Sequence, residues 1–193
     1  MLKMISQFAI LVKEVKKEGR MQSLRFDLTE KLRCIRLLIL DINRTPVPEK
    51  RQNRQPEERD IQNSISRDGH GVRTLQEMGV KIAVISTKNS DAVKNWASGL
   101  GIELIYGGIS EKKPIYEELK NRFGVSEREI AVIIVDTFPD FPLMESVGFS
   151  AATSTSDLEV KSRAYYVTYG KDGDEAVREV AELILKAQNN HRS

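Results

Sequence analysis

The sequence predicts an α/β fold in which a doubly wound, Rossmann-like parallel sheet carries helices on both faces. From Ile35 onward, short apolar runs alternate with amphipathic stretches, which is the pattern of a parallel sheet covered by helices. The chain has 193 residues, a usual length for one domain and too short for two of full size. One sheet with one surrounding shell of helices is therefore expected.

Three runs are the strongest strand candidates because they are continuously apolar and rich in β-branched residues, as parallel strands buried on both faces are. They span Ile35 to Leu40, Val80 to Ile85 and Ile130 to Val135. Weaker strands are expected at Glu103 to Tyr106, Phe149 to Ala152 and Tyr165 to Thr168.

The segments between these strands have apolar residues at helical spacing, which predicts helices. The expected helices are His70 to Met78, Ser90 to Leu100, Lys113 to Phe123, Asp140 to Val147 and Asp174 to Ala187. Glycine follows several of them, as it does at a helix C-cap. The glycines expected in that role are Gly79, Gly101, Gly124 and Gly148.

Two segments stand outside this alternation. Residues 1–33 are expected to form an N-terminal helical extension to a domain at 34–190, because Ile5, Phe8 and Val12 recur at helical spacing. The apolar run there is too short to span a bilayer and has no cleavage site of a signal peptide, although Met21 is an alternative start. Residues 44–62 hold three prolines and charges of both signs, so we expect a polar flap or loop there.

The composition of the chain limits the classes of partner that it is expected to bind. A formal charge of +2 is too small for a nucleic-acid footprint, and no segment suggests a membrane partner. The lone cysteine, Cys34, precedes an apolar run and is expected in the core, and without a disulfide the cytoplasm is the expected compartment. Trp96 is expected in the core with Val93 and Leu100, and His70 in a structural role.

Polar residues follow each strong strand: Asp41 after the first, Ser86 after the second and Asp136 after the third. The carboxyl ends of parallel strands meet in one crevice, where ligands of such sheets bind, so these side chains are expected together with Asp140 and Lys112. Carboxylates beside a lysine suit phosphoryl transfer. Asp41 can attack phosphorus, Asp41 and Asp136 can hold Mg²⁺, and Ser86 and Lys112 can bind phosphate oxygens.

Five segments carry a resemblance to a known family. They are residues 35–41 (IRLLILD), 67–86 (RDGHGVRTLQEMGVKIAVIS), 100–114 (LGIELIYGGISEKKP), 136–148 (DTFPDFPLMESVG) and 175–188 (EAVREVAELILKAQ). Their order and content resemble the haloacid dehalogenase-like superfamily, and more narrowly the phosphatases of 3-deoxy-D-manno-octulosonate 8-phosphate and their sialic-acid-pathway relatives.

The resemblance implies a magnesium-dependent phosphatase without a large cap domain, acting through an aspartyl-phosphate on a phosphorylated sugar or sugar acid. It also implies a homotetramer, although the hairpin that builds the tetramer in the family aligns with the polar segment 44–62. Carried over onto this sequence, the catalytic residues are Asp41, Asn43 and Lys112. The phosphate-binding residues are Ser86, Thr87 and Lys112, the metal ligands are Asp41, Asn43 and Asp136, and Asp140 supports them.

The sequence departs from the family where the chemistry lies. The family's second aspartate, its general acid and base, is Asn43, which cannot protonate a leaving group but still offers the backbone carbonyl that contacts the metal in the family. The family's Ser-Gly-Arg reads Ser-Thr-Lys at 86–88, and Gly-Asp-Asp reads Val-Asp-Thr at 135–137. Asp174 stands where the family has a substrate-facing arginine, so an anionic sugar acid would be repelled there.

Two functions of different class therefore remain open. The first is a phosphatase of reduced or altered activity, favoured by the retained nucleophile, serine, lysine and carboxylates. The second is a catalytically inactive relative that serves as an oligomerisation or ligand-sensing module, favoured by the replacements.

Overall fold

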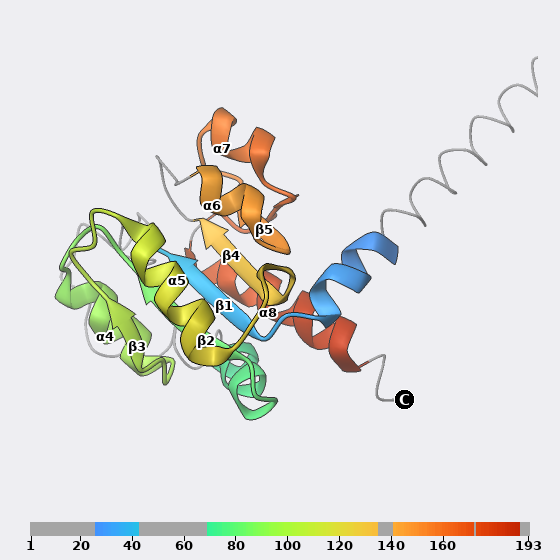
Figure 1. The fold of residues 1–193 in the computed structure, drawn as a ribbon, viewed down its shortest axis with the longest axis horizontal. Helices are drawn as coiled ribbons and strands as arrows, with labels where there is room; N and C mark the ends of the chain where they lie inside the picture. The colour runs from blue at the N-terminus through green and yellow to red at the C-terminus, as the bar shows by residue number, and fades with distance from the viewer. Residues whose placement is uncertain (1–25, 43–68, 135–140, 172, 190–193) are drawn as a thin grey trace, which may run out of the picture.

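A six-stranded parallel sheet forms the centre of the fold (Figure 1). The computed structural model describes residues 26–42, 69–134, 141–171 and 173–189. Along the sheet the strand order is β3-β2-β1-β4-β5-β6, and every neighbouring pair is parallel. The strands are β1 (Leu37–Asp41), β2 (Lys81–Ile85), β3 (Leu104–Tyr106), β4 (Ile130–Ile134), β5 (Phe149–Ala152) and β6 (Tyr166–Val167). The predicted doubly wound fold is confirmed. Successive strands are added on one side of β1 up to β3 and on its other side from β4 onward, so the strand order reverses between β1 and β4.

Helices cover both faces of this sheet, as predicted. They comprise residues 26–33, residues 69–77, α4 (Asp91–Gly99), α5 (Lys112–Phe123), the 3₁₀ turn η1 (Glu127–Glu129), α6 (Phe141–Ser146), α7 (Leu158–Arg163) and α8 (Gly173–Asn189). The predicted strands and helices agree with these bounds to within about two residues, and the helix at 26–33 lies in the segment expected to form a helical extension. The sequence does not predict α7.

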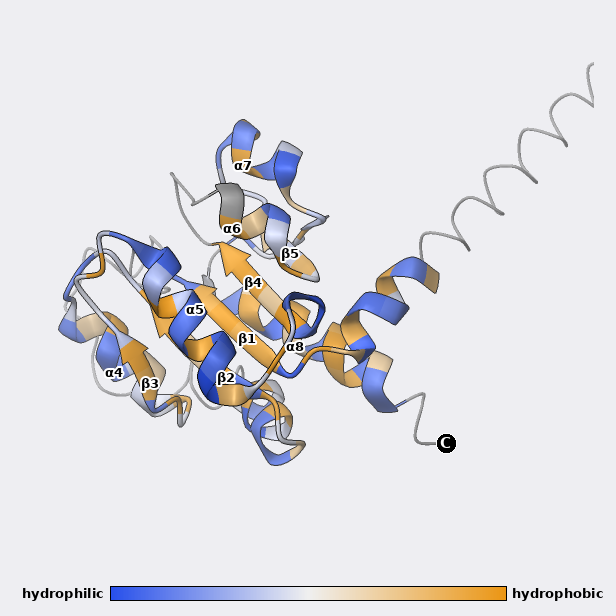
Figure 2. Cartoon of the chain, viewed as in Figure 1, coloured by the Kyte–Doolittle hydropathy of each residue, from blue (hydrophilic) through white to orange (hydrophobic). Residues whose placement is uncertain are grey.

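The strands are apolar throughout because each of their faces meets a separate core. Leu38 and Leu40 of β1 pack with α4 and α8 on one face, whereas Leu37 and Ile39 pack with α5 and α6 on the other. Figure 2 shows the contrast between the hydrophobic central strands and the hydrophilic outer surfaces of the helices. Every residue of β1 is buried, so the burial of apolar surface on two sides fixes the strand that ends in Asp41.

The four glycines predicted as helix C-caps serve two different structural needs. Gly124 caps α5 in the left-handed conformation, with a φ of 57°, and Gly79 and Gly101 also have positive φ. Gly148 does not, so the expectation that it is a C-cap of this type is wrong. A Cβ atom at Gly148 would lie 2.2 Å from the Arg128 carbonyl oxygen, and glycine is needed there for the close approach of two backbones.

Cys34 is exposed, so its predicted place in the core is wrong. It lies in the turn between the helix at 26–33 and β1. The inward positions of this turn are taken by Leu32 and Ile35, each only 1% exposed. The side chains of consecutive residues in a turn point in different directions, so Leu32 and Ile35 cannot face the core together with Cys34. The smaller Cys34 thiol faces solvent.

The helix at 26–33 contacts Tyr165, the residue before β6, and packs on the core that includes α8. Leu32 belongs to the same core as α8, and the Tyr165 hydroxyl donates a hydrogen bond to Asp27. Lys31 lies 4.9 Å from the centre of the Tyr165 ring, in a cation–π contact. Burial and the Asp27 carboxylate raise the pKa of Tyr165 to about 12. These contacts tie the described part of the N-terminal extension to the domain.

None of the helices in the described part of the chain is both long and apolar enough to cross a bilayer. The flap expected at 44–62 and the first apolar run of the N-terminal extension lie outside the described residues.

Candidate active site

A buried ion pair stands at the carboxyl end of the central strand. Asp41 is the last residue of β1, and Lys112 is the first residue of α5. The Lys112 Nζ lies 2.5 Å from the Asp41 Oδ2, and the two side chains are 7% and 5% exposed. Charged groups this deeply buried require a partner, and here each supplies the other's. Lysine is also disfavoured at the positive end of a helix, so the carboxylate offsets an unfavourable position.

Two adjacent glycines bring α5 to this place. The loop from β3 to α5 contains Gly107 and Gly108, and Gly108 has a φ of 74°. A Cβ atom at Gly107 would lie 3.2 Å from the Asn89 side chain and 3.4 Å from the Lys88 carbonyl oxygen. The loops that follow β2 and β3 therefore pack closely, and this packing places the first turn of α5 beside β1.

Ser86 lies at the same edge of the sheet as this ion pair. It follows Ile85, which pairs with Asp41 across the sheet, and it is 1% exposed. Its backbone N–H donates to the Tyr106 carbonyl at 2.8 Å, and its side-chain oxygen accepts the Lys88 N–H at 3.1 Å. The hydroxyl is thus positioned by backbone on both sides. Its neighbours in the sequence, Thr87 and Lys88, are exposed at the rim.

The structure brings Asp41, Ser86 and Lys112 to one edge of the sheet. The other predicted residues of this edge lie outside the described residues: Asn43, Asp136 and Asp140. Ile134, the last residue of β4, pairs with Asp41, and Asp136 follows it by two positions in the sequence. Within the described residues no three carboxylate, imidazole or thiol groups are clustered in a way that could hold a metal. The shared crevice and the metal ligands stay predictions.

Asp174 is buried against Trp96 rather than directed to solvent. It lies in the first turn of α8, is 5% exposed, and accepts a hydrogen bond from the Trp96 indole N–H. The prediction that Trp96 belongs to the core with Val93 and Leu100 is confirmed, but the sequence did not identify its hydrogen-bond partner. The one available signal is that a buried indole usually finds an acceptor.

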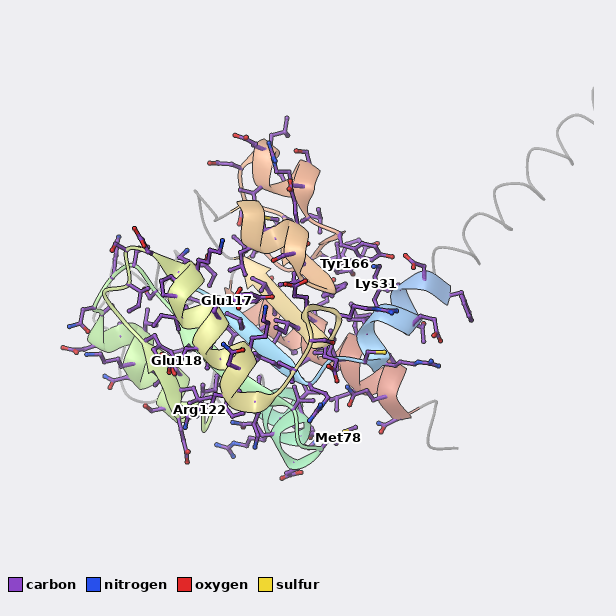
Figure 3. The ribbon with its side chains drawn as sticks, viewed as in Figure 1. Lys31, Met78, Glu117, Glu118, Arg122 and Tyr166 are labelled. Carbon is purple, nitrogen blue, oxygen red and sulfur yellow. The ribbon has the colours of Figure 1, made fainter. Side chains whose placement is uncertain are left out.

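Glu179 of α8 organises the loop after β6, and sequence analysis missed this role. Its carboxylate accepts the Tyr166 hydroxyl at 2.6 Å, the Tyr169 N–H at 2.9 Å and the Gly170 N–H at 3.0 Å. Burial and the Glu179 carboxylate raise the pKa of Tyr166. Figure 3 labels Tyr166. No local pattern in the sequence pairs a helical glutamate with a loop ten residues before it.

His70 lies exposed in the helix at 69–77, and its carbonyl oxygen accepts the Thr74 hydroxyl at 2.8 Å. Asp68, the expected cap of that helix, is outside the described residues. These contacts are compatible with the structural role that the sequence favours.

Comparisons with known proteins agree on one family, although no family model matches the chain. The chain is 37% identical over 123 residues to a 3-deoxy-D-manno-octulosonate 8-phosphate phosphatase of Yersinia pestis. That match covers 64% of this chain and 65% of the relative, just under two thirds of its length.

Solved structures extend the likeness to most of the chain. A crystal structure of a 3-deoxy-D-manno-octulosonate 8-phosphate phosphatase from Yersinia pestis is 30% identical with a TM-score of 0.70, over 86% of this chain and 89% of that one. The same kind of phosphatase from Moraxella catarrhalis, in complex with a magnesium ion, a phosphate ion and a KDO molecule, is 27% identical with a TM-score of 0.69, over 86% and 94% of the two chains.

Proposed function

Because the chain belongs to the haloacid dehalogenase-like superfamily, in the family of 3-deoxy-D-manno-octulosonate 8-phosphate phosphatases, we propose that it is a magnesium-dependent phosphomonoester hydrolase of reduced activity. The observation that carries this proposal is the buried ion pair of Asp41 and Lys112 at the carboxyl end of β1. Its substrate is proposed to be a phosphorylated sugar or sugar acid, the class that the relatives' names describe.

Asp41 is the proposed nucleophile. Its carboxylate attacks the phosphorus atom, the bond from phosphorus to the bridging oxygen breaks, and the sugar leaves as an alkoxide that needs a proton. Water then hydrolyses the aspartyl-phosphate and regenerates Asp41. Lys112 pairs with the carboxylate between turnovers and offers its ammonium to the phosphate oxygens, and the Ser86 hydroxyl can donate to the same group.

The residues proposed to hold magnesium are all oxygen donors, which is the chemistry that the ion prefers. Of these, the described structure contains the Asp41 carboxylate at the end of β1; the Asp136 carboxylate and the Asn43 carbonyl complete the proposed set. When bound, the ion supplies positive charge against the phosphate oxygens.

Asn43 is the proposed cause of reduced activity. An amide cannot give a proton to an alkoxide, and losing a positioned general acid typically costs about 10² to 10⁴ in rate. The same replacement, with Thr87 and Val135, favours the second candidate function, an inactive relative kept for oligomerisation or ligand sensing.

Two substrates distinguish these functions, because an aryl phosphate leaves as a stable phenolate and needs a proton far less than a sugar alkoxide does. Phosphate release is measured with magnesium for the native chain, Asp41→Asn and Asn43→Asp. We expect detectable aryl phosphate hydrolysis, almost none for a sugar phosphate, and none for Asp41→Asn. Asn43→Asp should raise the sugar phosphate rate selectively, by up to about 10² to 10⁴.

Two results would contradict this assignment. If Asn43→Asp leaves both substrates intact, the other replacements close the site and the inactive module is correct. If the native chain hydrolyses both substrates equally, another group donates the proton and Asn43 is not the defect. Thermal unfolding of each variant serves as the control that the fold is intact.

A further inference from the structure

A hollow lies at the opposite end of the sheet from Asp41, below the amino ends of β2, β1 and β4. Its volume is about 620 Å³, and small-molecule sites usually measure about 300 to 1,000 Å³. Figure 3 labels Met78 at this end of the sheet, away from the arrowheads of β1 and β4. The residues of the wall that matter for its chemistry are Arg33, Cys34, Arg36, Met78, Arg128 and Glu129.

Positive charge dominates this wall, with three arginines against one glutamate. The glutamate is already engaged: the Glu129 carboxylate accepts the Ser126 N–H at 2.8 Å, the Ser126 hydroxyl at 2.7 Å and Arg36 at 3.2 Å. The hydrogen bonds from Ser126, with a smaller effect of Arg36, lower the pKa of Glu129. Glu129 therefore remains ionised and orients the Arg36 guanidinium, which is 60% exposed and can accept a second anion.

The other two arginines differ, because only Arg128 adds a charge that no described carboxylate pairs with. Arg33 pairs with Glu30 at 3.0 Å along its own helix, an exposed pair that is worth little. Among the described residues, the Arg128 side chain makes no ion pair. Three guanidinium groups stand against the two carboxylates that pair with them, Glu129 and Glu30, so this concave surface keeps a net positive charge that attracts anions.

The wall is also rigid. The Arg36 N–H donates to the Glu129 carbonyl and the Lys81 N–H to the Arg36 carbonyl, both at 2.8 Å. The Gln188 side chain, from the end of α8, donates to the Ile35 carbonyl at 2.8 Å. These bonds link the segments before three strands and the last turn of α8, so the arginines project from a preformed frame. Less ordering is then needed when a ligand binds.

We propose that this hollow is a binding site for a small molecule that carries at least two negatively charged groups, such as a diphosphate or a tricarboxylate. Guanidinium groups bind phosphate and carboxylate in a bidentate manner, and Arg36 and Arg128 supply two such groups. Ile35 and Val80, which are 1% and 4% exposed, place apolar surface behind them. The site is separate from the phosphatase centre and does not depend on it.

The lone cysteine provides a reporter inside the hollow. Cys34 is exposed and lines it, and the chain has no second cysteine, so the rate of modification by the uncharged reagent N-ethylmaleimide reports on this wall alone. The rate is measured in increasing concentrations of inorganic pyrophosphate or citrate, against sodium chloride at matched ionic strength. Binding of the same two anions is measured by calorimetry on the same protein.

We expect saturable protection of Cys34 by one of these anions and not by chloride. The double variant Arg36→Gln/Arg128→Gln should raise the half-protecting concentration at least about tenfold, the effect of losing one charge-assisted hydrogen bond. Arg163→Gln on α7 removes the same charge outside the hollow and should change nothing. In the Asp41→Asn variant the anion should protect Cys34 as it does in the native chain, which separates this site from the proposed phosphatase centre.

Three results would overturn the proposal: no protection and no heat with either anion, heat without protection of Cys34, or protection that the double variant leaves unchanged. An unaltered rate of Cys34 modification without anion, together with an unaltered unfolding temperature, verifies that the variant is folded.

Discussion

Replacing Lys112 with methionine should destabilise the protein strongly, because it leaves the Asp41 carboxylate buried without its partner. At a separation of 2.5 Å and an effective dielectric constant of about 20, the attraction between two unit charges is about 7 kcal/mol. Side-chain exposures of 7% and 5% leave little room for screening by water. Breaking such a pair by removing one partner typically costs about 3 to 5 kcal/mol, and we expect Lys112→Met to lower the free energy of unfolding by that amount.

Urea unfolding can isolate this effect with two further variants. The exposed neighbour Lys113, also in the first turn of α5, supplies a matched control, and Lys113→Met should change stability by no more than about 0.5 kcal/mol. The double variant Asp41→Asn/Lys112→Met removes both charges and should be more stable than Lys112→Met alone, because no uncompensated charge remains.

The reasoning would be refuted by a loss below about 1 kcal/mol for Lys112→Met, the value of an exposed pair. A double variant no more stable than the single one would refute it as well, since the cost would then come from packing and not from the buried charge.

Three other outcomes are expected. Calorimetry should detect weak magnesium binding at millimolar concentrations, weakened further in Asp41→Asn; an absence of heat in the native chain would contradict the proposed metal ligands. Gly148→Ala should cost about 2 to 4 kcal/mol in urea unfolding, because its Cβ would meet the Arg128 carbonyl oxygen at 2.2 Å and backbone must move; a loss under about 0.5 kcal/mol would show that the two segments separate easily. Tyr165, whose pKa is raised to about 12 by burial and by Asp27, should contribute stability below pH 10 that is lost as the pH rises from about 10 through 12. Tyr165→Phe should reduce the fall in the free energy of unfolding over this pH range. An unchanged pH dependence would mean that the hydrogen bond from Tyr165 to Asp27 does not form in solution.

The strands could be predicted from sequence because one physical requirement governs them. A strand buried on both faces, such as Leu37–Asp41 or Ile130–Ile134, has to be apolar at every position, and that signal is local. The short helix α7 has no such signal: only Val160 among its six residues is buried, so its sequence resembles a loop. The prediction that Cys34 lies in the core is wrong for a related reason, since the orientation of this side chain depends on how the chain turns between two elements.

The candidate site was partly predictable because strand ends converge in a parallel sheet. This rule predicts that Asp41 and Ser86 lie at the same edge of the sheet, and the register of β1 and β2 agrees with it, because Asp41 pairs with Ile85, the residue before Ser86. The direct contact of Lys112 with Asp41 depends on the loop that carries α5. The partners of Asp174 and Glu179 depend on helix packing, which brings together residues that the sequence does not relate.

The central position of β1 has a consequence for how the protein folds. Leu37 pairs with Lys81 and with Ile130, residues 44 and 93 positions further along the chain. Each pairing requires a long segment to close into a loop, and the chain loses entropy before any contact within the sheet forms. Proteins with such topologies fold slowly. An intermediate that has assembled one half of the sheet leaves an edge of β1 unpaired and Asp41 without its full surroundings. The ion pair is therefore expected to form late, and nascent or partly unfolded chains should expose an apolar strand that is prone to association before they acquire a site.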